Sequence, residues 1–386
     1  MKHMKLIDAR EYFDVIRSYE KIILFGCGGK GRQAIKLLDD LDIHISAACD
    51  NNKEIQGTCF SGSIFIQSLD AVLRDIKNSK ACILLTCSIN YAIEMEQELN
   101  MKCPDIPVYH LCNPFKIEQT LISSAEIEQN RELLEKQYTW LGDEESKNIF
   151  TDTLNSKITG NMLPLLKYST GNAIYTFFDE QFIPMDEKNV YMDIGAYTGD
   201  TIASFMIYCR GRYERIVGFE ADKGNYKSLQ KFVQFSRVPN VEIYNIGLWS
   251  HEEEREFYTN NRNDEINYDS PNLFQNVDKM ADNLSLSKID GDLTCEVIHL
   301  KTLDEITKEV FPNIIKINAL AADRQIIMGG KKYIAENKPI LILEFGVTRK
   351  DVFEILSVIK EMNPDYTFYF RRKKVFGDIK TVAYCV

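Results

Sequence analysis

Apolar residues recur along this chain in short runs, and each run is followed by a segment with helical spacing. In the first part the runs cover residues 21–25, 43–49, 81–86 and 108–110. From about residue 189 they cover 190–194, 216–220, 241–246, 314–317 and 340–345. Strands that alternate with helices predict parallel sheets covered on both faces.

Two other stretches depart from this alternation. Residues 366–370 and 381–386 flank a short charged segment, Arg371-Arg-Lys-Lys374, which we expect to be a solvated turn of an antiparallel hairpin. Between residues 119 and 185, Ser123-Ser-Ala-Glu126 is typical of a capping box that opens a helix running to about Leu141. Asp143 then caps a second helix. The pattern therefore predicts a helical connector between two domains.

Composition agrees with a two-domain globular protein. The chain has 386 residues, 45% of them apolar, and a formal net charge of -11, which argues against a partner held through nucleic-acid phosphates. No apolar run approaches the roughly 18 residues of a membrane span, and the N-terminus shows no signal-peptide core. The 10 cysteines are scattered without metal-ligand spacing. We expect a cytoplasmic protein with reduced thiols and no metal.

The segment with the clearest chemistry is Asp193-Ile-Gly-Ala-Tyr-Thr-Gly-Asp-Thr201, which follows an apolar run. It predicts a buried strand, a tight turn at Gly195 and Gly199, and a helix from about Thr201. Glu220 ends the next apolar run, where a carboxylate can accept hydrogen bonds from two ribose hydroxyls. The turn and the acid together predict a site for a ribose-bearing cofactor.

S-adenosylmethionine suits this site better than a dinucleotide. Asp200 at the start of the helix would repel a pyrophosphate, whereas a zwitterionic methionine group tolerates it. Gly247 and Leu248, in Asn245-Ile-Gly-Leu-Trp249 after the third strand, are expected to flank the adenine, although plain core packing is also open for this segment. A parallel sheet that ends in an antiparallel pair is the ordinary form of a class I methyltransferase domain.

From about residue 140 to the end, the chain resembles the FkbM family of S-adenosylmethionine-dependent methyltransferases. The resemblance rests on Leu141-Gly-Asp-Glu-Glu-Ser146, Tyr191-Met-Asp-Ile-Gly-Ala-Tyr-Thr-Gly-Asp-Thr201, Phe219-Glu-Ala-Asp222, Gly247-Leu-Trp-Ser250, Thr302-Leu-Asp-Glu305 and Ile315-Lys-Ile-Asn318. It implies methylation of hydroxyl groups, often on sugars or natural products. The cofactor residues then expected are Asp193, Gly195, Ala196, Tyr197, Gly199, Thr201, Glu220, Ala221, Gly247 and Leu248.

One segment departs from the family pattern at the catalytic position. Where the family usually reads Lys-Met-Asp-Ile-Glu-Gly-Ala-Glu, this chain reads Lys316-Ile-Asn-Ala-Leu-Ala-Ala-Asp323. Asn318 replaces the acid at the strand end and Leu320 replaces the next acid, and an amide cannot take up a proton near neutral pH. Asn318 and Asp323 are the catalytic candidates. For Asp323, a position on a helix surface without a catalytic role fits the sequence equally well. His251 and His299 are further candidates for a base, but surface positions fit them better.

The first domain carries a second glycine pattern. Gly26, Gly28 and Gly31 follow a strand and Asp50 closes the next strand, which matches a dinucleotide-binding fingerprint in spacing. The domain resembles the N-terminal nucleotide-sugar-binding unit of bacterial sugar acetyltransferases. A nucleotide, a nucleotide-sugar, NAD and a purely structural role all stay open.

These observations predict an α/β protein made of two Rossmann-like domains, residues 1–118 and 186–386, joined by a helical connector over 119–185. The leading hypothesis is a cytoplasmic O-methyltransferase that uses S-adenosylmethionine on a sugar, glycan or sugar nucleotide. A non-catalytic binding or scaffold protein is the alternative that Asn318 and Leu320 motivate, and an NAD-dependent oxidoreductase is a weaker one. The sequence leaves the acceptor and a homo-oligomeric state open.

Overall fold

The computed structural model describes residues 4–112, 120–168, 177–260, 293–319, 322–375 and 378–386. The described residues pack as two compact units. The first lies within Met1–Glu132 and Phe150–Tyr168, and the second contains Leu133–Ile149 and most of the remainder. Leu320, part of the expected catalytic segment, lies outside the described residues.

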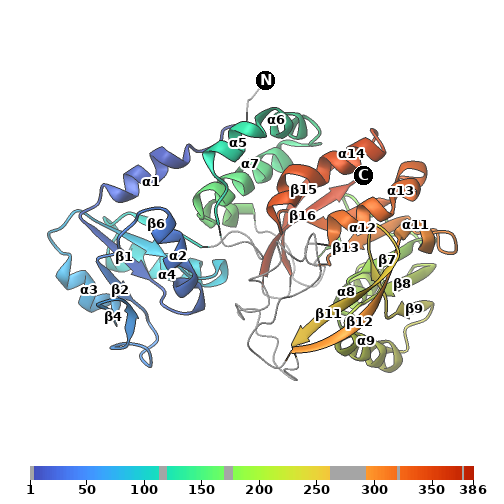
Figure 1. Cartoon of the computed structure of the whole chain (residues 1–386), viewed down its shortest axis with the longest axis horizontal. Coiled ribbons are helices and arrows are strands. Elements are labelled where there is room, and N and C mark those ends of the chain that lie inside the picture. The colour runs from blue at the N-terminus through green and yellow to red at the C-terminus, as the bar shows by residue number, and fades with distance from the viewer. Residues whose placement is uncertain (1–3, 113–119, 169–176, 261–292, 320–321, 376–377) are drawn as a thin grey trace. The chain divides into compact units, whose positions relative to one another are not determined.

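The first unit is built on a six-stranded sheet with the order β3-β4-β2-β1-β5-β6, in which only the β3–β4 pair is antiparallel (Figure 1). Its strands are β1 (Lys21–Phe25), β2 (Ala47–Cys49), β3 (Cys59–Ser61), β4 (Ile64–Gln67), β5 (Ala81–Leu85) and β6 (Val108–His110). Its helices are α1 (Ala9–Arg17), α2 (Gly29–Asp40), α3 (Leu69–Asp75), α4 (Ile89–Lys102), α5 (Ser124–Gln129) and the 3-10 turn η1 (Leu163–Tyr168).

Strand β1 shows why this sheet is buried on both faces. Ile22 and Leu24 pack in one apolar cluster with residues of α1 and α2, such as Phe13 and Leu37. Residues 23 and 25 pack in another cluster with residues of α3 and α4. Alternate side chains of a strand point to opposite faces, so an uninterrupted apolar run is needed where helices cover both.

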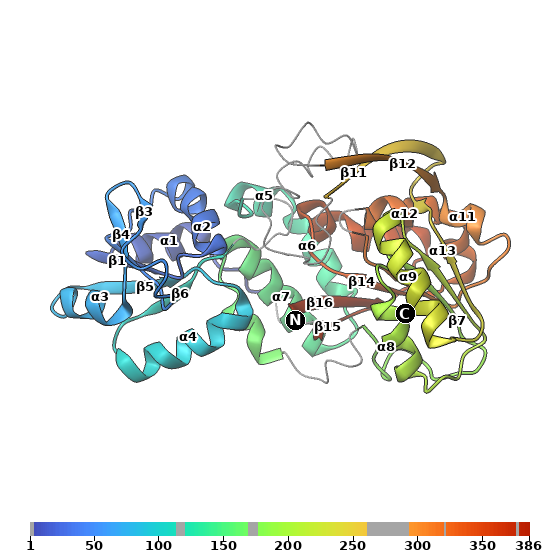
Figure 2. The ribbon, with the colours of Figure 1, turned by 90° about the horizontal axis from the view of Figure 1, so that it is seen from below.

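The second unit holds a seven-stranded sheet with the order β15-β16-β14-β13-β7-β8-β9. Its strands are β7 (Val190–Ile194), β8 (Arg215–Phe219), β9 (Val241–Tyr244), β13 (Ile314–Ile317), β14 (Ile340–Glu344), β15 (Phe368–Val375) and β16 (Asp378–Cys385). The five strands from β14 to β9 are parallel, while β16 pairs antiparallel with both β14 and β15. A smaller sheet with the order β10-β12-β11 is formed by β10 (Gly247–Leu248), β11 (Glu253–Asn260) and β12 (Leu293–Lys301). Figure 2 shows β11 and β12 side by side, outside the larger sheet.

Helices and an aromatic segment cover this larger sheet. The helices of this unit are α8 (Asp200–Tyr208), α9 (Lys223–Ser236), α11 (Leu303–Ile306), α12 (Asp323–Gly329), α13 (Lys331–Asn337), the π-helical turn η3 (Asp351–Ile355) and α14 (Leu356–Met362). One face packs Tyr191, Ile342 and Tyr384 against α8, α9 and the segment Phe177–Ile183. The stacked rings of Tyr191 and Phe205, with centroids 4.3 Å apart, lie in this cluster.

The boundary between the units falls inside two helices, α6 (Arg131–Thr139) and α7 (Glu144–Thr159). The capping box at Ser123 is confirmed, but the helix it opens ends at Gln129, and α6 begins after Asn130. Asp143 caps α7 as predicted, because its carboxylate accepts a hydrogen bond of 2.7 Å from the backbone N–H of Ser146.

The expectation of a solvated turn at residues 371–374 is wrong. These residues belong to β15, and Arg371 and Arg372 are buried. The guanidinium of Arg371 lies 2.7 Å from the carboxylate of Asp143 and also donates to Gln181. Asp143, 228 residues away in sequence, neutralises a charge that the local pattern assigns to solvent.

Candidate functional site

The predicted glycine turn leaves the carboxyl end of β7. Gly195 and Gly199 have φ angles of +76° and +97°, which glycine adopts without strain. A Cβ on Gly195 would lie 2.3 Å from the carbonyl oxygen of Asn318, and a Cβ on Gly199 would lie 2.3 Å from the Phe232 ring. Conformation and lack of space therefore both require glycine at these two positions.

A buried ion pair lies beneath this turn. Asp193 is fully buried, and one of its carboxylate oxygens lies 2.8 Å from Nζ of Lys316 on β13. The other oxygen accepts a hydrogen bond from the hydroxyl of Thr201 at the start of α8. The same ammonium donates to the carbonyl of Gly195 at 2.8 Å. One salt bridge thus joins two strands, the turn and the following helix.

Lys316 is a residue of this site that the sequence pattern did not single out. A signal was present, since a lysine stands inside the otherwise apolar strand Ile314–Ile317. The register places Lys316 opposite Asp193 on the neighbouring strand, where a charge needs a partner.

Glu220 directly follows β8, and both of its oxygens already accept hydrogen bonds. Oε2 accepts from the backbone N–H of Tyr197 in the turn at 2.8 Å, and Oε1 accepts from that of Asp222 at 2.9 Å. Burial raises the pKa of the Glu220 carboxyl, and these two donors act in the opposite direction. Each carboxylate oxygen has a second lone pair for a ligand, so Glu220 can hold the turn and a ligand together.

The remaining predicted cofactor residues surround the turn and the end of β8. Ala196 is buried and donates its backbone N–H to the carbonyl of Phe219 at 2.9 Å. Asn245 donates its side-chain amide to the carbonyl oxygens of Glu220 and Ala221, at 2.8 and 3.0 Å. Gly247 and Leu248 form the short strand β10.

Asp200 begins α8 and is half-buried. Burial raises the pKa of its carboxyl, while the ammonium groups of Lys316 and Lys380 lower it. An acid at this helix N-terminus disfavours a phosphate, because its charge opposes the attraction of the helix dipole for anions.

The two catalytic candidates lie next to each other after β13. Asn318 is partly buried, and its carbonyl oxygen is the atom that abuts Gly195. Asp323 is fully buried rather than on a helix surface, and its carboxylate accepts a hydrogen bond of 2.8 Å from the backbone N–H of Ala319. Asp323 thereby helps to shape the loop that follows the strand.

The second glycine site, in the first unit, repeats this arrangement. Asp50 follows β2, and its carboxylate accepts from the backbone N–H of Cys27 at 2.6 Å and from that of Asn52 at 2.8 Å. A Cβ on Gly31 would lie 2.0 Å from the carbonyl oxygen of Gly26, whereas the space beside Gly28 is open. Asp50 is therefore bonded to its glycine turn as Glu220 is to the turn after β7.

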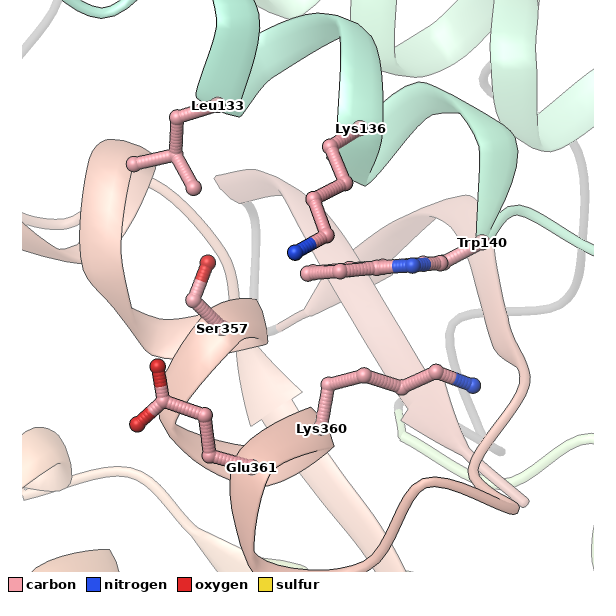
Figure 3. A pocket seen from close by; sticks show the side chains of 6 residues that line it. All are labelled: Leu133, Lys136, Trp140, Ser357, Lys360 and Glu361. Atoms are coloured by element: carbon pink, nitrogen blue, oxygen red, sulfur yellow. The ribbon is translucent and has the colours of Figure 1, made fainter.

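Other polar groups lie apart from these turns. His251 and His299 are exposed beside Glu253 and Glu254, as expected for surface positions. A groove of about 240 Å³ shares no residue with either turn. Figure 3 shows the side chains that line it, Leu133, Lys136, Trp140, Ser357, Lys360 and Glu361. None of the described helices combines the length and apolar character needed to cross a membrane.

Replacing Lys316 with methionine should destabilise the second unit by about 3–5 kcal/mol, because it leaves the buried Asp193 carboxylate without its cation. Both tryptophans, Trp140 and Trp249, belong to that unit, so denaturant unfolding followed by their fluorescence reports on it alone. Lys308→Met, which removes an exposed pair with Glu305, should lower the free energy of unfolding far less, because solvent screens that pair. Equal losses in the two variants would contradict the structural role given to Lys316.

Replacing Gly195 with alanine should lower the free energy of unfolding by more than the same change at Gly211. Gly211 also has a positive φ, +71°, but the space beside it is open, so alanine there meets only backbone strain of about 1 kcal/mol. At Gly195 the close approach of Asn318 adds to that strain. Unfolding curves for the two variants measure the difference, and similar midpoints would show that the turn relaxes freely.

Comparisons with known proteins agree with the geometry of the second unit. Residues 193–366 match the family model described as the methyltransferase FkbM domain. The solved structure of the FkbM methyltransferase from Methylobacillus flagellatus KT superposes with a TM-score of 0.67 at 16% identity. That match covers 99% of this chain and 94% of the other, and it shows a shared fold.

Two further solved structures superpose on about half of the chain. An rRNA methylase from Streptococcus thermophilus and an Aeropyrum pernix fibrillarin with natively bound S-adenosylmethionine each have a TM-score of 0.30 and 10% identity. They cover 52% and 53% of this chain, and 87% and 69% of their own. A search of the curated proteins finds no match. At the level of the domain, residues 193–366 match the FkbM family of methyltransferases.

Proposed function

We propose that this protein is an S-adenosylmethionine-dependent O-methyltransferase that acts on a sugar, a glycan or a sugar nucleotide in the cytoplasm. The observation that carries the proposal is the buried Glu220 carboxylate bonded to the backbone of the Gly195–Gly199 turn. The FkbM domain match over residues 193–366 supports the reaction class.

The residues at the turn fit the donor set that S-adenosylmethionine requires. Glu220 would accept hydrogen bonds from the ribose hydroxyls, and Asp193 would order the loop on which the methionine amino group lies. Gly195 and Gly199 let the backbone approach a ligand closely. When bound, the cofactor supplies an electrophilic methyl group on a sulfonium. This chain supplies its orientation, which accounts for much of the rate in an in-line transfer.

The loop after β13 would meet the acceptor. Asn318 can donate and accept hydrogen bonds through its amide, so it can orient a hydroxyl without removing a proton. Asp323 would support it from below, because its carboxylate already holds the backbone of Ala319. If the protein is instead a non-catalytic binding protein, the natural chain should show no turnover, and Asn318→Asp should create it.

For the first unit we propose a Rossmann-like domain that binds a nucleotide or a nucleotide-sugar. Helix α2 begins at Gly29 without a side-chain cap and without an acid in its first turn, in contrast to Asp200 on α8. Phosphates are favoured at such a helix end. Asp50, which accepts from the backbone N–H of Cys27, would also accept from a ribose hydroxyl. NAD fits the same groups, and the oxidoreductase alternative would require a hydride-transfer partner in this unit.

The cofactor assignment is tested by titrating the full chain with S-adenosylhomocysteine in a calorimeter. We expect saturable binding, and Glu220→Ala should weaken it at least tenfold, because both the ribose contact and the support of the Tyr197 backbone are lost. Asp50→Ala is the matched control, since it removes the equivalent acid from the other unit and should leave the affinity unchanged. Absence of binding at millimolar ligand would refute the assignment, and retained affinity in Glu220→Ala would mean that the site lies elsewhere.

A further inference from the structure

A second ion pair, between a buried acid and a partly buried lysine, lies at the same edge of the seven-stranded sheet. Ile317 pairs with Leu343 on the neighbouring strand, and Asn318 and Glu344 are the residues that directly follow this pair. The acid that the family pattern expects at position 318 is absent, and a carboxylate stands one strand away. Among the acids that the structure describes, Glu344 is thus the one whose position along its strand best matches that of the missing acid.

Glu344 is held by a lysine from the antiparallel strand. Its carboxylate lies 2.9 Å from Nζ of Lys380, and the two side chains are 6% and 14% exposed. Glu344 pairs with Val382 on β16, and β16 runs in the opposite direction. Lys380 therefore lies beyond the carboxyl end of β14, at the edge from which the glycine turn also leaves.

The two ion pairs share one face of the sheet. Lys316 is level with Ile342, and Glu344 is two residues further along the same strand, so the three side chains point to the same side. The ring centroid of Phe177 lies 5.7 Å from the ammonium of Lys316 and 5.7 Å from that of Lys380. Burial raises the pKa of the Asp200 carboxyl at the start of α8, and the ammonium of Lys380 is among the charges that lower it. The Glu344–Lys380 pair therefore borders the turn described above.

Such a pair contributes little to stability, because the desolvation of two charges offsets most of their attraction. Ligands of open α/β sheets bind at the carboxyl ends of the strands, which is where this pair lies. Because the Glu344–Lys380 pair lies at that edge and adds little to stability, it is a candidate for binding a ligand.

We propose that Glu344, oriented by Lys380, is the group that receives the acceptor hydroxyl and takes over the role of the missing acid at position 318. The inference rests on the proposed methyl transfer. The hydroxyl oxygen bonds to the methyl carbon, the electron pair of the methyl–sulfur bond stays on sulfur, and the hydroxyl proton passes to the Glu344 carboxylate. The acceptor is an uncharged alcohol, such as a sugar hydroxyl.

The test requires no acceptor, because a carboxylate that faces the transferred methyl group also faces the positive sulfonium. S-adenosylmethionine carries that charge and S-adenosylhomocysteine does not. In Glu344→Gln the affinity for S-adenosylmethionine, relative to S-adenosylhomocysteine, should fall by roughly threefold or more. Lys380→Met, which leaves the carboxylate without its cation, should raise this ratio of the affinity for S-adenosylmethionine to the affinity for S-adenosylhomocysteine. Calorimetric titration of the full chain with both ligands measures it.

Glu242→Gln is the control for the loss of one carboxylate, since Glu242 pairs with Arg215 on β8 and β9 of the same sheet. Its ratio should match that of the natural chain. Unchanged ratios in both Glu344→Gln and Lys380→Met, with normal binding, would overturn the role of the pair and leave the cofactor assignment intact. A natural chain that binds neither ligand would overturn the proposed function and this inference with it. Should Glu344→Gln fail to fold, the affinity ratio measured for Lys380→Met still tests the role of the pair.

Discussion

The site in the second unit depends on the buried salt bridge between Asp193 and Lys316. Two charges far from water are tolerated only when their hydrogen-bonding capacity is filled, and here Thr201 and the carbonyl of Gly195 complete it. The bridge therefore fixes the backbone of the turn from below, while Glu220 fixes it from the side. Gly195 is pressed against the end of β13 as a result, so the turn after β7 lies close to the backbone of Asn318.

A division of labour follows from the order of the strands. The ends of β7 and β8 carry the groups proposed to hold the cofactor, and the ends of β13 and β14 carry those proposed to meet the acceptor. The loss of an acid at Asn318 affects only the second group. A chain can keep the first arrangement intact and still place the proton acceptor on a different strand, provided that the new carboxylate lies on the same face.

The local pattern of the sequence was enough to predict the α/β class, most of the strands and the positions of Gly195 and Gly199, because each depends on neighbours along the chain. It could not predict partners joined by the fold. Lys316 and Asp193 are 123 residues apart. Arg371 lies in a charged segment that the local pattern assigns to a turn, and Asp143, which neutralises its charge, is 228 residues away. The strands β3 and β4 were missed because they are short and only partly apolar. The break at Asn130 interrupts a pattern that is otherwise helical.

The hydrogen bonds of Glu220 bear on the thermodynamics of ligand capture. Because the carboxylate already fixes the N–H groups of Tyr197 and Asp222, the turn is ordered before any ligand arrives. Little backbone entropy is then lost on association, so more of the favourable contact energy appears as affinity. Asp50 and the turn at Gly26 share this preorganisation, so a ligand of either turn would bind without first folding a loop.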